Sequence, residues 1–455
     1  MSIDNFYIDN YVMNFISKYR YPSISVGIIF NDEIYLRGYG FKNIKESIAA
    51  DERTLYCIGS ITKSFTALAI MKLYEEGLLD LEDPISEYIS GKLPKWLTSS
   101  DISIHNLLTH TSGLPALGYA EAFIDGLVGL TREWLPVTEA KDIISFMNEA
   151  GEWIVSKPSE YFYYLNEGYV LLGIIISKVS GLSYEEYVKK NILVPLDMKR
   201  SFFKREEILN DGGLATPYIT DKEGNFIKAT FPFGITSDGG LVSNVKDMIN
   251  YLRMYLNRGS FDGRRILSSE NIARMEKGYV KLPYRSSHGV EYYGYGLITN
   301  EDFYGYKLIG HSGSILVHTA YMGYIPEKKL GVVLLSNGAG YRLSYLGMSI
   351  LAYLLGRDPE KLPFIRNEKI LDKLTGVYHS YKKTMEVNVE KKGSILYLVF
   401  KNKYGGEKIP LFPEKIEYDH ATFKTMVDWR EYEVEFVIKD GVIKLYYERY
   451  KFLKD

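Results

Sequence analysis

Three short groups of residues in this sequence have the types and spacing needed for nucleophilic acyl transfer. In chain order they are Ser60 and Lys63, then Tyr164 and Asn166, then His311, Gly313 and Ser314. A serine hydroxyl attacks a carbonyl when a neighbouring base takes its proton, and the developing oxyanion needs N–H donors. Each pattern is weak alone, because Ser-x-x-Lys recurs at 201–204, 243–246 and 380–383 and Tyr-x-Asn recurs at 255–257. The sequence around each copy of a pattern must therefore show which copy has a catalytic role.

Ser60 and Lys63 open a strongly apolar segment that reaches Gly77 and is predicted to be a helix. One interpretation is that Ser60 only caps the helix N-terminus. The catalytic interpretation is that a separation of three residues brings Lys63 beside Ser60 on the helix surface. Aliphatic surroundings would favour the uncharged amine, which could accept the serine proton. The first turn of the helix would supply N–H groups for an oxyanion.

Tyr164 lies between the aromatic run 161–163 and an apolar helix predicted from about residue 168. It is either one more core tyrosine among 40 or a phenol that carries a proton between nucleophile and leaving group. In the catalytic interpretation Asn166 could orient a substrate amide. The competing Tyr-x-Asn at 255–257 falls on a charged amphipathic segment and is predicted to be solvated.

His311 lies at the margin of a predicted strand, after the apolar pair 308–309. The simpler interpretation is a turn with an exposed histidine. The catalytic interpretation is that Gly313 leaves room for a substrate backbone to pair with the strand edge. The backbone N–H of Ser314 would then join that of Ser60 as the second oxyanion donor.

In this order, the three patterns resemble those of the serine β-lactamase and penicillin-binding-protein superfamily. The most similar branch is the class C-like group with CubicO-type peptidases and family VIII esterases, in which the third motif is often His-x-Gly. Segments 76–84, 107–115 and 171–181 carry the resemblance across most of residues 1–355.

The resemblance assigns roles to five side chains. It implies that Ser60 is the acylated nucleophile and that Lys63 and Tyr164 form the general-base pair. It also implies that Asn166 and His311 contact substrate or relay a proton. Many β-lactamases have a lysine in place of His311, and a neutral imidazole holds a carboxylate less firmly, so we expect weak penicillinase activity. His110, in the segment 107–115, is expected to be structural.

The elements around these motifs predict an α/β domain over 1–355. A helix over 4–19 and a hairpin of strands 23–30 and 33–39 precede a mostly helical region from 62 to 256. Strands are predicted near 292–298, 306–309, 315–325 and 330–337, and a helix near 342–355. This order predicts a β-lactamase-like fold: an antiparallel sheet assembled from both ends of the domain and flanked by helices, with a mostly α subdomain.

A second, smaller domain is predicted at the end of the chain. Residues 356–372 contain Pro359 and Pro363 and are predicted to be a linker. Alternating runs at 385–390, 395–401, 433–438 and 442–447 predict a small antiparallel barrel or sandwich over 373–455. The segment 374–378 resembles the start of the lipocalin-like domain carried by some CubicO-type peptidases. It could bind an apolar ligand, cover the active site or mediate assembly.

Composition narrows the classes of protein that remain. The 455 residues are 46% hydrophobic and 25% charged, which excludes intrinsic disorder. A formal charge of −2 leaves no excess of positive charge that would favour binding to nucleic acid. The single cysteine, Cys57, excludes a disulfide framework and favours a cytoplasmic protein. With no His-Glu-x-x-His, no dinucleotide loop and no Gly-x-Ser-x-Gly elbow, we expect no metal, no cofactor and no ordinary α/β-hydrolase.

The sequence thus predicts a serine hydrolase that acts through a Ser60 acyl-enzyme. We expect a CubicO-type peptidase or amidase for short peptides, with D-residue-containing peptides among the candidates. The alternatives are a carboxylesterase or weak β-lactamase of the same fold, or a penicillin-binding sensor without turnover. The expected partner is a small molecule or short peptide; a membrane partner is not expected, and a homo-oligomer is left open.

Overall fold

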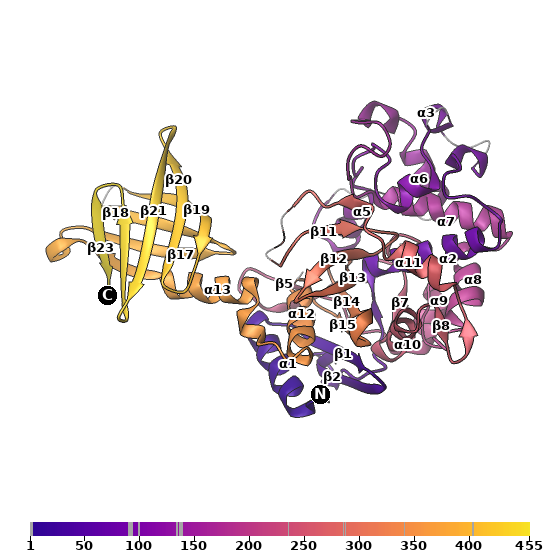
Figure 1. The fold of residues 1–455 in the computed structure, drawn as a ribbon, viewed down its shortest axis with the longest axis horizontal. Helices are drawn as coiled ribbons and strands as arrows, with labels where there is room; N and C mark the ends of the chain where they lie inside the picture. Colours follow the sequence, from indigo (N-terminus) through magenta and orange to yellow (C-terminus); the bar gives the residue numbers. More distant parts are fainter. Residues whose placement is uncertain are drawn as a thin grey trace. The chain divides into compact units, whose positions relative to one another are not determined.

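The computed structural model describes residues 3–89, 94–98, 101–132, 135, 140–234, 236–284, 286, 288–340, 342–402 and 405–455. The chain forms two compact units, Met1–Arg357 and Asp358–Asp455 (Figure 1). None of the helices in the described parts of the chain has the length and apolar content needed to cross a lipid bilayer.

The first unit is built on a nine-stranded sheet with the order β10-β11-β12-β13-β14-β15-β1-β2-β3 and antiparallel pairing throughout. Its N-terminal strands are β1 (Ser23–Phe30), β2 (Glu33–Asn43) and β3 (Ile48–Ala49). The others are β10 (Val280–Lys281), β11 (Glu291–Tyr293), β12 (Ile298–Phe303), β13 (Tyr306–Ser314), β14 (Thr319–Ile325) and β15 (Leu330–Ser336). The predicted assembly of the sheet from both ends of the domain is confirmed.

Helices cover both faces of the central strands, which explains their continuous apolar sequences. Gly27 of β1 and Gly331 of β15 face side chains of α10 (Val245–Leu256). Tyr321 of β14 faces the opposite way, because side chains alternate along a strand, and it meets Gly347 of α12 (Leu343–Leu354). Helix α1 (Asn5–Tyr19) packs on α12 (Figure 1).

The segment between β3 and β10 has helices as its main regular structure, as predicted for 62–256. Its α-helices are α2 (Thr62–Glu75), α3 (Lys95–Thr98), α4 (Ile104–Leu108), α5 (Tyr119–Val128), α6 (Ala140–Phe146), α7 (Asn166–Ser180), α8 (Tyr184–Val188), α9 (Arg205–Asp211), α10 and α11 (Ser269–Met275). Short strand pairs interrupt them: β4 (Tyr56–Cys57) with β7 (Val242–Ser243), β5 (Tyr218–Thr220) with β6 (Phe226–Lys228), and β8 (Ser260–Phe261) with β9 (Arg264–Arg265). Helix α2 packs against α7 in the core of the unit, which places its first turn between the helical region and the sheet.

Three strand predictions were wrong in their bounds: 292–298, 306–309 and 315–325. The run 292–298 is not one strand: it holds the end of β11, a turn over 294–297 in which Gly294 donates to the carbonyl of Leu297, and the first residue of β12. The strand predicted at 306–309 continues to Ser314, and 315–318 is a turn with Leu316 at φ 65°. Ile315 and Val317 are buried in this turn, so their apolar character reflects burial and not a strand.

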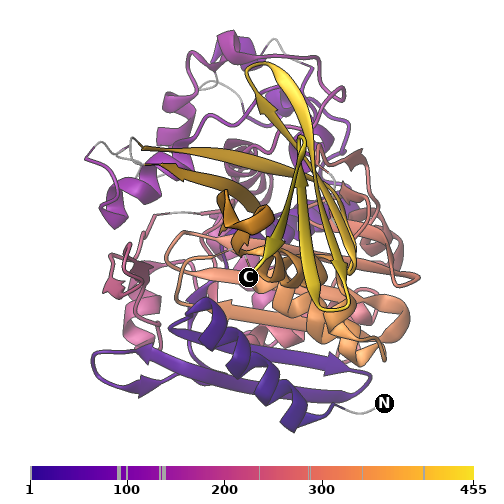
Figure 2. The same ribbon diagram turned by 90° about the vertical axis from the view of Figure 1, so that its left-hand side faces the viewer.

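The second unit is a closed barrel of eight antiparallel strands (yellow in Figures 1 and 2). They are β16 (Gly376–His379), β17 (Glu386–Lys392), β18 (Ile395–Asn402), β19 (Gly405–Ile416), β20 (His420–Val427), β21 (Arg430–Lys439), β22 (Val442–Tyr447) and β23 (Tyr450–Lys454). The barrel core is packed with apolar side chains, among them Leu398, Phe423 and Phe436. Most of the predicted linker belongs to this unit, because α13 (Pro363–Leu374) buries Ile370 and Leu371 with the barrel residues.

Candidate active site

Ser60 lies in a short 3-10 turn, Gly59–Ile61, immediately before α2. The N-cap of α2 is Ile61 and makes no side-chain capping bond, so the interpretation of Ser60 as the helix cap is wrong. The Lys63 amine instead lies 3.1 Å from the Ser60 hydroxyl oxygen. The separation of three residues therefore brings the two groups within hydrogen-bond distance.

Lys63 is fully buried in polar and aromatic surroundings, not in the aliphatic ones expected from the sequence. Its Nζ donates to Asn166 Oδ1 at 2.8 Å and to the carbonyl of Asp238 at 2.6 Å, and the rings of Tyr164 and Tyr169 flank it. Those two oxygens only accept, so they take two hydrogens from Nζ. These two contacts hold the Lys63 amine against the Ser60 hydroxyl, which is the geometry that a general base requires.

Tyr164 and Asn166 are positioned by the loop that enters α7. The buried His110 holds this loop: its carbonyl accepts from the N–H of Tyr163 at 2.8 Å, and its Nδ1 accepts from the N–H of Leu165 at 3.0 Å. The His110 ring packs 4.2 Å from the Tyr164 ring. Burial lowers the pKa of His110 well below its usual value, so the imidazole is neutral and Nδ1 is free to accept.

Two glycines let the Ser60 turn approach β13 closely. A Cβ on Gly59 would lie 2.5 Å from the nitrogen of Ser314, and Gly59 has a left-handed φ of +52°. A Cβ on Gly313 would lie 1.9 Å from the carbonyl oxygen of Ile58 and 3.1 Å from the nitrogen of Ser60. The backbone amides of Ser60 and Ser314, predicted as oxyanion donors, therefore come from two segments in direct contact.

His311 is buried within β13, so the interpretation as an exposed turn residue is wrong. Its Nδ1 donates to the carbonyl of Ser312 at 2.5 Å, which leaves Nε2 to accept from the hydroxyl of Tyr293 at 3.1 Å. Burial lowers the pKa of His311 to about 4, because the charged imidazolium is disfavoured away from water. A neutral ring with both nitrogens engaged is suited to positioning neighbours rather than to relaying a proton.

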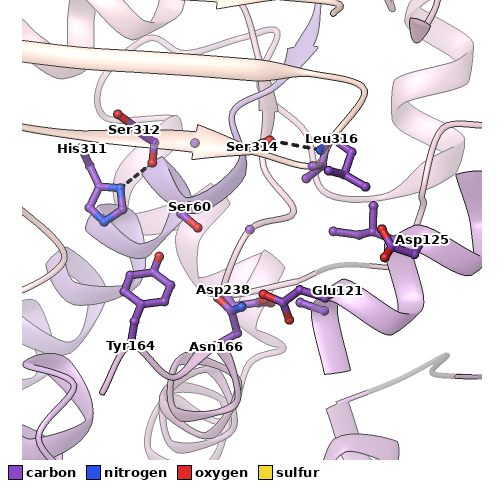
Figure 3. A pocket seen from close by; sticks show the side chains of 15 residues that line it. Ser60, Glu121, Asp125, Tyr164, Asn166, Asp238, His311, Ser312, Ser314 and Leu316 are labelled. Atoms are coloured by element: carbon purple, nitrogen blue, oxygen red, sulfur yellow. Dashed lines mark hydrogen bonds between the residues drawn. The ribbon is translucent and has the colours of Figure 1, made fainter. Parts of the chain in front are cut away.

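The predicted residues meet at one pocket of about 430 Å³. It is lined by Ser60, Tyr164, Asn166, His311, Gly313 and Ser314, and the Lys63 amine adjoins Ser60 and Asn166. Figure 3 shows the Tyr164 hydroxyl and the Ser60 side chain pointing into the same space, below His311 and the strand that carries it.

The competing motifs have structural roles. Ser201 and Ser243, the first residues of two further Ser-x-x-Lys patterns, are buried and share a hydrogen bond of 2.8 Å. Tyr255 was predicted to be solvated, but it is fully buried because α10 packs against the sheet, and its hydroxyl contacts that of Tyr251.

Sequence reasoning missed three acidic residues of the pocket wall, Glu121, Asp125 and Asp238. The first two have i, i+4 spacing, which predicts one helix face, but nothing in the sequence says that this face meets Ser60.

Comparisons with known proteins agree with this geometry. A family model described as Beta-lactamase matches residues 8–351, and one described as the Pab87 octamerisation domain matches residues 359–453. The octameric penicillin-binding protein homologue from Pyrococcus abyssi is 47% identical, with a TM-score of 0.93, over 99% of this chain and 100% of that one. Protein flp from Staphylococcus aureus is 28% identical over 333 residues, or 72% of this chain. Penicillin-binding protein 4* from Bacillus subtilis is 26% identical over 80% of this chain and 79% of its own length.

The region shared with the staphylococcal protein covers 62% of that protein's length.

Proposed function

The chain belongs to the beta-lactamase family, and on that premise we propose that it is a serine hydrolase acting through an acyl-enzyme on Ser60. The observation that carries this proposal is the 3.1 Å contact between Lys63 Nζ and Ser60 Oγ at the wall of the pocket. The carbonyl and amide oxygens that accept from Lys63 orient the amine toward the serine.

In the acylation step, Ser60 Oγ attacks the substrate carbonyl carbon and Lys63 Nζ takes the hydroxyl proton. As the Oγ–C bond forms, the carbonyl electron pair moves to oxygen, where the N–H groups of Ser60 and Ser314 stabilise it. Each such donor contributes about 10²–10³ to turnover in known enzymes. The C–N bond then breaks, and the proton passes from Lys63 through the Tyr164 hydroxyl to the leaving amine.

In the deacylation step, water adds to the ester carbonyl of the acyl-enzyme and gives its proton to Lys63. The C–Oγ bond breaks, Ser60 recovers the proton, and the carboxylic acid leaves. His311 and His110 act here as positioning residues, because they fix β13 and the Tyr164 loop through their ring nitrogens.

We further propose that the substrates are amides of short peptides, with D-residue-containing peptides among them. The support is the Tyr164 hydroxyl beside Ser60, since an amine needs a proton to leave whereas an aryl oxide does not. Turnover of amino-acid amides and short peptides, compared with p-nitrophenyl esters, tests this directly. Measurable amide hydrolysis that disappears in Ser60→Ala is expected. Strong ester hydrolysis with no amide hydrolysis would favour the carboxylesterase alternative.

We propose that the barrel unit assembles copies of this chain. The support is the matched octamerisation-domain model, the octameric homologue, and a barrel core filled by apolar side chains. Trp429 is 94% exposed at the β20–β21 turn, where both Asp428 and Trp429 have left-handed backbones. An exposed tryptophan is typical of an interface anchor.

Native mass spectrometry of the full chain tests the assembly. We expect an oligomer that Trp429→Ser weakens and that Trp153→Ser, a matched change of an exposed tryptophan in the first unit, leaves intact. A monomeric wild-type chain would contradict the proposal.

A cytoplasmic location is a further proposal, based on the single, buried Cys57, and cell fractionation would check it.

A further inference from the structure

The wall of the pocket on α5 carries two carboxylates that have no partner among the residues that the structure describes. Glu121 and Asp125 are one helical turn apart, so their Cβ atoms are about 5–6 Å from each other, and both line the pocket with Ser60. Within the described residues, neither carboxylate makes a hydrogen bond or an ion pair. Two like charges this close on a helix destabilise it slightly, so their presence at the pocket needs another explanation.

Asp238 gives a second and independent indication of a missing ligand. Its side chain lines the same pocket and is only 2% exposed. The Tyr119 hydroxyl hydrogen-bonds to this carboxyl group, but Oδ1 itself has no hydrogen-bond partner among the residues that the structure describes. A buried carboxylate oxygen without a donor costs free energy, and a donor on a bound molecule would remove that cost.

The described residues that line the pocket include no positively charged side chain that could compensate an anionic ligand. Neither lysine nor arginine is among the described residues that line it. The Lys63 amine is already bonded to Ser60, Asn166 and Asp238, and His311 is neutral. Among the described lining residues, a substrate carboxylate would therefore find no cationic side chain to pair with, whereas a cation would find the carboxylates of Glu121 and Asp125.

The geometry around Ser60 indicates which part of the substrate carries the cation. Figure 3 shows Tyr164 and His311 on one side of Ser60, and Glu121 and Asp125 on the other. If Tyr164 protonates the leaving amine, the leaving group lies on the Tyr164 side. The acyl part of the substrate must then extend towards α5.

We propose that the acyl donor carries a primary ammonium group, which Glu121 and Asp125 bind at the pocket wall formed by α5. This inference rests on the proposed hydrolase function and specifies its substrate class: amides or peptides with a positively charged acyl residue. The ammonium has two possible sources, a free α-amino group or a lysine side chain, and both present the same chemistry to the carboxylates.

The test compares four chromogenic amides of the stereochemistry that the wild type prefers. They are alanine p-nitroanilide, acetyl-alanine p-nitroanilide, acetyl-lysine p-nitroanilide and succinyl-alanine p-nitroanilide. We expect kcat/KM to be highest for a cationic substrate and lowest for the succinyl compound. Preference for free alanine assigns the site to the α-ammonium, and preference for acetyl-lysine assigns it to the ε-ammonium.

The variants Glu121→Gln and Asp125→Asn, singly and together, test the assignment. An exposed ion pair raises binding affinity by up to about fivefold. Because the double variant removes two such pairs, it should lower the ratio of kcat/KM for the cationic substrate to kcat/KM for acetyl-alanine by about tenfold. The control Glu46→Gln/Glu223→Gln removes two exposed charges elsewhere in the first unit and should keep the wild-type ratio. Thermal unfolding verifies that each variant is folded.

Two results would overturn the inference: no preference of the wild type for either cationic substrate over acetyl-alanine, or an unchanged ratio in both single variants and in the double variant. Hydrolysis of p-nitrophenyl acetate separates this failure from failure of the proposed function. If Ser60→Ala abolishes ester turnover while the ratio does not respond to Glu121 and Asp125, only the ammonium site is wrong. If Ser60→Ala hydrolyses the ester as fast as wild type, the hydrolase mechanism itself is wrong.

Discussion

Replacing Gly313 by alanine adds one methyl group where β13 meets the Ser60 turn. The new Cβ would lie 1.9 Å from the carbonyl oxygen of Ile58, and the atom in its way is backbone rather than a flexible side chain. Relieving this overlap requires the two segments to separate by about 1 Å. A displacement of catalytic groups by that distance lowers the rate of the catalysed reaction on the order of 10²-fold.

The expected effect on catalysis follows from the amides that this separation moves. The N–H groups of Ser60 and Ser314 would no longer converge on one oxygen, and losing one oxyanion donor costs about 10²–10³ in kcat. We therefore expect kcat to fall by about that factor in Gly313→Ala. The overpacked contact should also lower the free energy of unfolding by about 1–3 kcal/mol.

Acylation by p-nitrophenyl acetate, measured as the pre-steady-state burst, reports the affected step. Gly168→Ala is the matched control, because the atoms nearest to a Cβ there belong to the Leu165 and Leu107 side chains and lie 3.4 Å or more away. Because residue 168 lies in α7, this substitution should leave the acylation rate unchanged and stabilise the helix by about 0.5–1 kcal/mol. If folded Gly313→Ala acylates within threefold of wild type, the glycine contact does not build the oxyanion site.

Three further predictions concern buried polar groups. Lys63→Met should lower kcat by about 10²–10⁴, measured by steady-state hydrolysis, because Ser60 loses its base. Burial raises the pKa of Glu167 to about 7, so the folded chain keeps a proton that the unfolded chain releases near 4.5. Stability should fall by up to about 3 kcal/mol as pH rises across that interval, and urea unfolding at about pH 5 and 8 should show a weaker dependence in Glu167→Gln. Tyr293→Phe removes the donor to His311 and should lower the free energy of unfolding by about 1–3 kcal/mol, measured in urea; an unchanged midpoint would contradict that role.

Local patterns in the sequence predicted the fold and the positions of the motifs. The alternation and length of the strands identify β1 as residues 23–30 and β22 as residues 442–447, the bounds observed in the structure. The spacing of Ser60 and Lys63 on a helix predicts their proximity, because helix geometry alone determines it.

The partners of these residues could not be predicted, because they come from distant parts of the chain. Lys63 donates to the main-chain carbonyl of Asp238, 175 residues away, and main-chain atoms leave no signal in residue type. The polar surroundings of Lys63 and the bonds of both His311 nitrogens depend on packing between α2, α7 and β13. Glu121 and Asp125 of α5 likewise reach the pocket only through packing between segments that are distant in the sequence.

Covalent labelling with a fluorophosphonate, followed by peptide mapping in a mass spectrometer, tests the pairing of Ser60 and Lys63 most directly. One adduct on the peptide that contains Ser60 is predicted, absent in Ser60→Ala and formed at least about 100-fold more slowly in Lys63→Met. An adduct on another residue, or labelling of Lys63→Met at the wild-type rate, would contradict the account.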